Sequence, residues 1–134
     1  MKIAVIGSRD DHPTKEFIED KLLPYITSEV EFVSGGARGV DTIAAEIAAE
    51  YGIPMTVFKP RKDIPYPANL FARNDQIIEY CDIVFAFMKK GGSNGTMHGV
   101  RYAWRLKKKV HIYYADDNDL LHDSGMATPV VEDK

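Results

Sequence analysis

The chain has little of several features that would define its class. It has a single cysteine, Cys81, so an internal disulfide and a zinc site built from several cysteines are both excluded, and the lone thiol suits a reducing compartment. No apolar run is long enough to span a membrane, and the stretch from Met1 to Gly7 is too short for a signal peptide. The isolated histidines His12 and His98 lack the spacing of metal ligands. We therefore expect a cytoplasmic protein with no metal site and no resident cofactor.

An excess of positive charge is also missing. The 134 residues carry 17 lysines and arginines against 20 aspartates and glutamates, a formal net charge of −3. This balance argues against a protein whose main task is to coat nucleic acid, although it leaves room for a local basic cleft. The length and the 45% of hydrophobic residues fit one domain with a sizeable core. Neither nucleic acid nor a membrane is therefore the expected partner.

What is present is a regular alternation of strand and helix patterns. Each apolar run is continuous rather than alternating, which is typical of strands covered on both faces. The expected strands are residues 3–6, 30–33, 55–58, 83–87 and 110–113. Helices between successive strands predict an α/β fold, a parallel sheet with helices on both faces. In such sheets ligands bind beyond the C-terminal strand ends, and a strand order of 3-2-1-4-5 would place the switch point between the first and fourth strands.

The helices between these strands have recognisable ends. Pro13 suits a first helical turn, and Pro24 should kink or end that helix early. Gly52 is in the usual position after the helix that starts at Val40. The third helix is expected at about residues 70–80. The fourth is expected to end at about residue 106. From Ala115 the sequence is polar and acidic, so we expect one domain, residues 1–114, and a loosely packed acidic tail, residues 115–134.

The stretch from Gly91 to His98 follows the fourth strand and opens a helix. A glycine-rich turn at a helix N-terminus is an anion site, because free N–H groups point outward and the helix dipole favours negative charge. No lysine follows the last glycine as in a Walker loop, and the first turn lacks the GxGxxG of a dinucleotide fold, so ATP hydrolysis and conventional NAD binding are disfavoured. We expect phosphate binding by Gly92, Ser93, Gly95 and Thr96. The alternative is a tight turn in which Thr96 simply caps the helix.

Two further loops are expected at the same edge of the sheet. Their candidate binding residues are Gly7, Ser8 and Arg9 after the first strand, and Ser34, Gly35, Gly36, Arg38 and Asp41 after the second. Arg38 can pair with a phosphate in bidentate fashion. Asp41 can accept hydrogen bonds from ribose hydroxyls or act at the N-terminus of its helix. Arg9 either faces the crevice or pairs at the surface with Asp10 or Asp11.

The third helix offers further candidates. Arg73 and Asn74 can reach the same cleft, but a solvated helix face is the better interpretation from the sequence alone. Tyr66 and Phe71 flank a proline-rich loop and can stack on a base, although a core position is the better interpretation of Phe71. The run from Lys107 to Lys109 ends a helix, where cations favour the dipole, and does not indicate a nucleic-acid patch.

Four strings of residues, in this order and at these strand positions, resemble one family. They are Gly7-Ser8-Arg9, Ser34-Gly35-Gly36-Ala37-Arg38-Gly39-Val40-Asp41, Ala72-Arg73-Asn74 and Gly92-Ser93-Asn94-Gly95-Thr96. The chain resembles the YspA-like branch of the superfamily that unites the DNA-processing Smf (DprA) proteins with the lonely-guy proteins, called SLOG. The resemblance covers about residues 1–113.

This resemblance implies a three-layer Rossmann-like sandwich whose five-stranded parallel sheet has the order 3-2-1-4-5. It also implies that the phosphate loop and the pocket residues Gly35, Gly36 and Arg38 bind a nucleotide or a nucleotide-derived ligand such as an ADP-ribose-like molecule. The expected role is that of a sensor or processor of this small molecule. The sequence does not fix the oligomeric state, and the resemblance implies a homodimer or a higher homo-oligomer.

Enzymatic activity is the point at which the chain departs from the lonely-guy enzymes. Those enzymes cleave the N-glycosidic bond of nucleoside monophosphates and carry a glutamate three residues after the threonine, where this chain has Gly99. A carboxylate there would stabilise an oxocarbenium-like state. Asp10, Asp41 or Asp75 can replace it only if the fold brings one of them to the sugar, so the catalytic residues are unknown. A binding protein is the first hypothesis, a nucleotide hydrolase the second, and single-stranded DNA binding a distant third.

Overall fold

The computed structural model describes residues 1–89 and 91–115. The elements are, in chain order, β1 (Lys2–Gly7), α1 (Lys15–Leu22), the 3₁₀ helix η1 (Leu23–Tyr25), β2 (Glu31–Ser34), α2 (Val40–Tyr51), β3 (Met55–Val57), α3 (Ala68–Tyr80), β4 (Ile83–Met88), α4 (Asn94–Arg105) and β5 (Lys109–Tyr114). The five expected strands are present with small shifts at their ends. The expected tail, apart from Ala115, lies outside the described residues.

The strands form one parallel sheet in the order β3-β2-β1-β4-β5. In its register Ile3 pairs with Ile83 and Gly7 pairs with Phe87, so β1 and β4 end side by side. The chain reverses its direction across the sheet between these two central strands, which creates a switch point at their C-terminal ends. The order and direction confirm the expected three-layer Rossmann-like fold.

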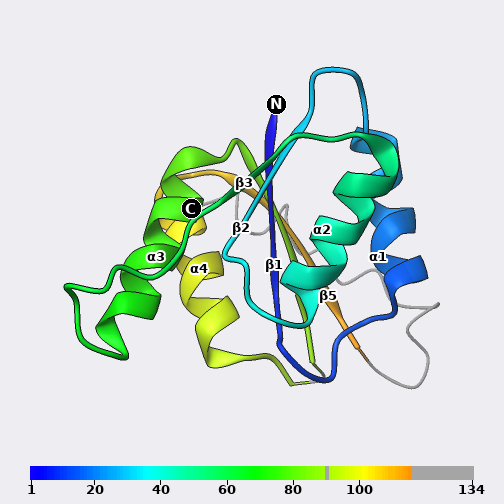
Figure 1. The fold of residues 1–134 in the computed structure, drawn as a ribbon. Coiled ribbons are helices and arrows are strands. Elements are labelled where there is room, and N and C mark those ends of the chain that lie inside the picture. Colours follow the sequence, from blue (N-terminus) through cyan, green and yellow to red (C-terminus); the bar gives the residue numbers. More distant parts are fainter. Residues whose placement is uncertain (90, 116–134) are drawn as a thin grey trace.

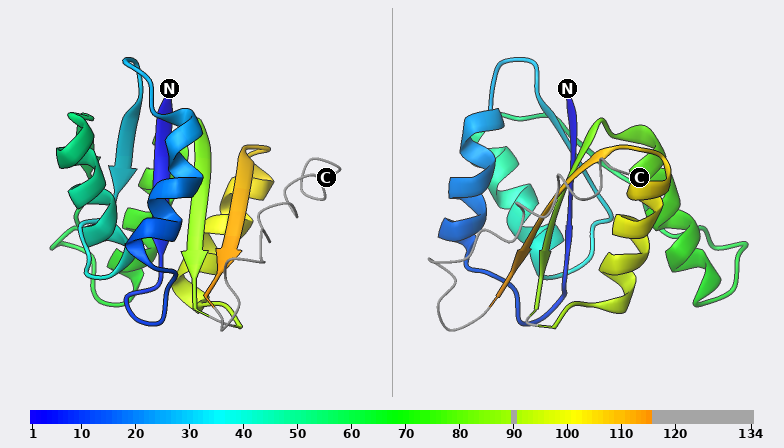
Figure 2. Two further views of the ribbon diagram at one scale, coloured as in Figure 1. Left: turned by 90° about the vertical axis from the view of Figure 1, so that its right-hand side faces the viewer. Right: turned by 180° about the vertical axis from the view of Figure 1, so that it is seen from behind.

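Helices cover both faces of the sheet (Figures 1 and 2). Helices α1 and α2 pack on one face over a core that includes Phe32, Phe85 and Phe87. Helices α3 and α4 pack on the other face over smaller side chains, among them Ala4 and Ala86. Both cores are buried, as the continuous apolar runs predict for a parallel sheet covered by helices.

Local sequence determines where the helices begin and end. The expectation that Pro13 begins α1 is wrong, because the N-cap is Thr14, whose hydroxyl accepts a hydrogen bond from the Phe17 N–H. Pro24 ends α1 as expected, and the chain continues as η1. Gly52 follows α2 with a φ of 66°, the left-handed conformation that glycine adopts without strain. None of the helices within residues 1–89 and 91–115 is long and apolar enough to cross a membrane.

Candidate functional site

A cavity of about 490 Å³ lies at the C-terminal edge of the sheet, where β1 and β4 end. Its size falls in the range of roughly 300–1,000 Å³ that is typical of small-molecule sites. Most of the residues expected from the sequence line it: Gly7, Ser8, Arg9, Gly35, Asp41, Arg73, Asn74, Ser93, Gly95 and Thr96. The other four expected residues, Ser34, Gly36, Arg38 and Gly92, are not part of the described lining. Three loops and helix α3 thus meet around one space.

The loop after β1 is fixed to the end of β4. The Ser8 N–H donates to the Phe87 carbonyl at 3.0 Å, and the Ser8 hydroxyl accepts from the Lys89 N–H at 2.9 Å. Gly7 is required here, since a Cβ at this position would lie 2.2 Å from the Phe87 oxygen and 2.5 Å from Val40 Cγ2. The buried hydroxyl of Ser8 therefore joins the two loops that flank the switch point.

The loop after β2 is held in shape by its own polar side chains. The buried Ser34 hydroxyl accepts a hydrogen bond from the Gly36 N–H at 3.4 Å. Asp41 accepts from the Ala37 N–H at 3.0 Å from the first turn of α2. Gly36 has a φ of 71°, and a Cβ there would lie 2.8 Å from a methyl group of Val57. Ser34 and Gly36 thus shape the loop, and Asp41 both shapes it and faces the cavity.

Arg73 is the buried cation of the site. Only 7% of the residue is exposed, although its guanidinium reaches the cavity from α3. Its Nη1 donates to the Gly35 carbonyl at 2.8 Å and its Nε donates to Asn74 Oδ1 at 2.9 Å. A Cβ on Gly35 would lie 2.6 Å from Nη1, so this approach requires glycine. The interpretation of Arg73 as part of a solvated helix face is wrong, because the β2–α2 loop covers its side chain.

The N-terminus of α4 contributes further polar groups to the cavity lining. Ser93 is its N-cap, and the Ser93 hydroxyl accepts from the Thr96 N–H and donates to the Thr96 hydroxyl at 3.2 Å. The alternative in which Thr96 is itself the cap is therefore wrong, and Thr96 is a buried residue of the first turn. A Cβ at the exposed Gly95 would meet nothing within 4 Å, so the cavity is open at this point. Gly92 has a φ of 92° and makes the preceding turn.

The charges around the cavity are mixed. Arg9, Arg73 and Lys89 line it together with Asp10, Asp11 and Asp41. Burial raises the pKa of Asp41, while its hydrogen bond from Ala37 and the positive charge of Arg73 act in the opposite direction. Burial lowers the pKa of Arg73, and the charge of Asp41 opposes this. The guanidinium still remains protonated at neutral pH.

Arg38 and Asp75, both named as candidates from the sequence, each pair with another side chain. Asp10 pairs with Arg38, whose Nη2 lies 3.0 Å from its Oδ2, and both side chains are exposed. Arg38 itself is not part of the described cavity lining. It contacts the lining only through Asp10. Asp75 is also not part of the described cavity lining. Its carboxylate lies 2.9 Å from Nε2 of His98.

The rest of the cavity lining is apolar. Most of its residues were not among the binding residues expected from the sequence. This apolar wall is formed by Ile6, Leu70, Phe71, Ile77, Ile78 and Gly99, with Tyr66 and Pro67 beside them. Phe71 is 38% exposed and packs against His98 with ring centroids 4.7 Å apart, so the core position expected for it is wrong. Leucine and isoleucine at helical spacing carry no signal that separates a core from a cavity wall. Lys89 and Asn94 were also missed, although Lys89 precedes the glycine-rich stretch and Asn94 lies within it.

Metal chemistry and thiol chemistry find no support in the described residues. No group of three or more histidines, cysteines, aspartates or glutamates among them is placed to hold a metal ion. The only cysteine, Cys81, is buried at the end of α3, and burial raises its pKa to about 11. A thiol with this pKa is protonated and unreactive at neutral pH.

Comparison with solved structures shows the same fold in DNA processing proteins. DNA processing protein A (DprA) from Streptococcus pneumoniae superposes with a TM-score of 0.71 at 22% identity, over 93% of this chain and 54% of that one. DprA from Helicobacter pylori, a structure that concerns its single-stranded DNA binding mode, superposes with a TM-score of 0.68 at 23% identity, over 88% of this chain and 67% of that one. The chain thus spans about half the length of the pneumococcal protein.

Comparison at the sequence level gives one family. No curated protein sequence matches the chain significantly. The model of the family described as DNA recombination-mediator protein A matches residues 1–91. This supports the superfamily expected from the four strings of residues. Since the match extends over well more than half of the 134 residues, the chain belongs to the DNA recombination-mediator protein A family.

Proposed function

We propose that the cavity binds a nucleotide or a nucleotide-derived ligand through its phosphate, and that the chain acts as a sensor in the manner of the YspA-like branch. The observation that carries this proposal is the position of Arg73. A guanidinium that is almost fully buried, held by Gly35 and Asn74, faces the same cavity as the N-terminus of α4. Two of its five N–H groups make these bonds, which leaves further donors for an anion.

The first turn of α4 supplies complementary groups. Its N-terminal N–H groups have no partner within the helix, and its dipole favours negative charge. The hydroxyls of Ser93 and Thr96 lie on this turn, and Gly95 leaves the backbone accessible. Arg9 and Lys89 add positive charge at the rim. In this proposal Ser34, Gly36, Arg38 and Gly92 act indirectly, by shaping the loops or holding Asp10.

Hydrolysis of the N-glycosidic bond is the second candidate. Asp10 and Asp41 line the cavity, as a replacement for the missing glutamate at Gly99 must do. Asp41, however, accepts the Ala37 N–H, and this role in the loop is sufficient to account for its position. Binding without turnover is therefore the simpler proposal. Chromatography after incubation with nucleoside monophosphates distinguishes the two, because a hydrolase releases free base and ribose phosphate.

Single-stranded DNA is the third candidate ligand, and it is favoured by the family and by the H. pylori neighbour. A DNA strand presents the same phosphate and sugar groups as a mononucleotide. The chain carries a net charge of −3, and the cavity wall balances three cations with three carboxylates. Long-range attraction to a polyanion is therefore weak. A gel shift with an oligothymidylate at low salt that gives no complex would exclude this ligand.

Calorimetric titration with AMP, ADP-ribose and oligothymidylate tests the main proposal. We expect AMP or ADP-ribose to bind, and Gly95→Val to lower the affinity at least about tenfold, or roughly 1.4 kcal/mol. A Cβ at this position would meet nothing within 4 Å, so we expect valine to fit there and to shield the N–H groups of the first turn of α4. The thermal stability of the variant should stay close to that of the natural sequence.

The matched control is Ala45→Val, which places the same side chain on the exposed face of α2, outside the cavity lining. Its affinity should be unchanged. Equal losses of affinity and stability in Gly95→Val would mean that the loop is a structural turn only. The absence of any heat with all three ligands would refute nucleotide binding.

A further inference from the structure

The cavity has two chemically different walls. Its polar wall consists of the first turn of α4 and Arg73, with the loops after β1 and β2. Its apolar wall, defined above, has Ile6 from β1, Gly99 from α4 and four side chains of α3. A free phosphate needs only the polar wall. The apolar wall therefore fits a second, less polar part of the same ligand.

Gly99 keeps this apolar wall open. It lies on the same side of α4 as Gly95, because residues four apart in a helix are neighbours on its surface. A Cβ at Gly99 would lie 3.3 Å from Cδ1 of Ile6 and 3.7 Å from Cδ1 of Ile78. One methyl group would thus already touch both isoleucines, and a longer side chain would displace them or extend into the cavity that all three residues line.

The Phe71 end of this wall is held in place by the contact between His98 and Asp75. Phe71 packs on the ring of His98, and His98 is bound by Asp75 of α3. The aromatic ring is thereby fixed against α4 although more than a third of the residue is exposed. The apolar wall thus combines an aromatic ring with aliphatic side chains and a glycine, and we call the space beside it the apolar slot. An aromatic side chain on such a wall suits a flat ring system, because flat rings stack on one another.

We propose that this slot takes the base of the ligand, and that Gly99 is the residue that determines base binding. This deepens the proposed function, on which it rests: the ligand is a nucleotide with an unpaired base, and a sugar phosphate alone is a poor ligand. The absence of a side chain at position 99 then has a role of its own.

The test compares three probes by calorimetry on the full chain: AMP, ribose 5-phosphate and inorganic phosphate. For the natural sequence we expect AMP to bind at least about tenfold more tightly than ribose 5-phosphate. Gly99→Leu should reduce this ratio to about threefold or less by weakening AMP, with ribose 5-phosphate within about twofold of its original affinity. Gly99→Ala should give an intermediate ratio. Ala45→Leu, on the exposed face of α2, is the control and should leave the ratio unchanged.

The outcomes separate the two proposals. If AMP and ribose 5-phosphate bind the natural sequence equally well, phosphate binding stands and the base slot is refuted. The same holds if Gly99→Leu or Gly99→Ala weakens both probes to the same extent. If no probe binds the natural sequence, the proposed function itself fails. Should Gly99→Leu not fold, as judged by its thermal unfolding, the comparison of probes on the natural sequence and on Gly99→Ala still decides the matter.

Discussion

The two faces of the sheet are built differently. Under α1 and α2 the side chains are large and form a continuous aromatic cluster, in which Phe85 lies against Tyr25, His111, Phe87 and Tyr113. Under α3 and α4 they are smaller, and at the C-terminal edge of the sheet these helices border the cavity. One face is filled by large side chains, whereas the other borders the cavity.

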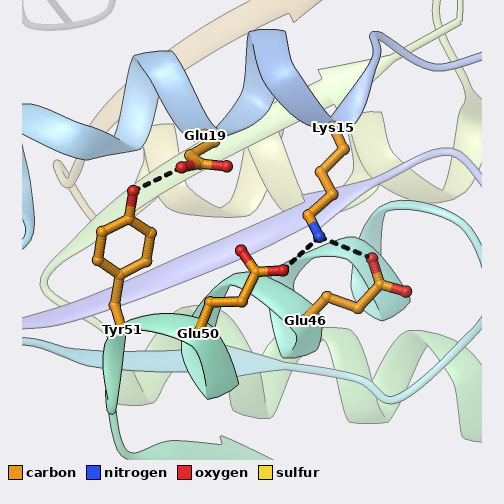
Figure 3. Close-up of polar contacts among 5 residues, drawn as sticks. All are labelled: Lys15, Glu19, Glu46, Glu50 and Tyr51. Carbon is orange, nitrogen blue, oxygen red and sulfur yellow. Dashed lines mark hydrogen bonds and ion pairs between the residues drawn. The ribbon is translucent and has the colours of Figure 1, made fainter.

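The helix pairs are also tied together differently. Helices α1 and α2 are joined along their exposed sides by a surface clasp, in which Lys15 binds Glu46 and Glu50, and Tyr51 donates to Glu19 (Figure 3). Helices α3 and α4 are joined at the ends away from the cavity, where Tyr102 donates to Glu79. Lys108, just after α4, donates to three carbonyls at the end of α3. These contacts lie at the far ends of α3 and α4 from Arg73 and from the first turn of α4.

Phe85→Ala gives the largest expected effect and tests the filled face. Phe85 is fully buried, so its removal should lower the free energy of unfolding by about 3–5 kcal/mol. Urea unfolding measures this loss. Because Phe85 lies on the face opposite α3 and α4, the affinity of the folded protein for AMP at low temperature should change less than about twofold. A large loss of affinity would show that the two faces are not independent.

Arg73→Met tests the open face. The affinity for AMP should fall about 30-fold, or roughly 2 kcal/mol, because a charge-assisted contact to phosphate is lost. The unfolding free energy should fall by about 1–3 kcal/mol, since the Gly35 carbonyl loses its donor. Calorimetry and urea unfolding measure the two effects. Arg73→Lys is the matched variant that keeps the charge without the planar fork, and an unchanged AMP affinity in Arg73→Met would overturn the role of this residue.

The sequence was sufficient for the fold because its signals are local or depend on chain order. The continuous apolar runs, Pro24 and Gly52 each act within a few residues. The burial of Arg73 could not be predicted from such local signals, because it depends on a contact with Gly35, 38 residues earlier in the chain. The exposure of Phe71 likewise depends on its packing against His98 of another helix.

The lysines after α4 illustrate the same limit. These lysines were expected to place positive charge near the C-terminus of their own helix, α4. Lys108 does place its charge near a helix C-terminus, but the helix is α3. Lys108 binds the carbonyls of Ile78, Glu79 and Cys81, at the end of α3. The sequence predicted the kind of interaction, and only the packing of α3 against α4 shows which helix receives it.

Lys108→Met tests this tie with an intermediate effect. The loss of three charge-assisted hydrogen bonds at a partly buried helix end should lower the unfolding free energy by about 1–2 kcal/mol. The AMP affinity should be unchanged, because Lys108 lies away from the cavity lining. Lys107→Asn is the control: it removes the same charge one residue earlier, and asparagine tolerates the φ of 62° found there. Equal destabilisation by both variants would indicate a general charge effect.

The surface clasp should give the smallest effect, and its pH dependence has a defined sign. The hydrogen bond to Glu50, with smaller contributions from its charge and from Glu46, raises the pKa of Lys15 above its usual 10.5. A cation with a raised pKa in the folded state stabilises the protein fully below pH 10.5, and this stabilisation is lost as the pH rises through the folded value.

Lys15→Met should therefore lower stability slightly in urea unfolding at neutral pH, and the difference from the natural sequence should shrink in strongly alkaline solution. Tyr51, whose own pKa is raised by its hydrogen bond to Glu19, is present in both proteins, so its titration largely cancels in this difference. High salt should also reduce the difference, since exposed ion pairs are screened. A difference that grows with pH would show that the clasp does not act through the charge of Lys15. The contact between α1 and α2 would then rest on the hydrogen bond from Tyr51 to Glu19 and on the buried side chains of the two helices.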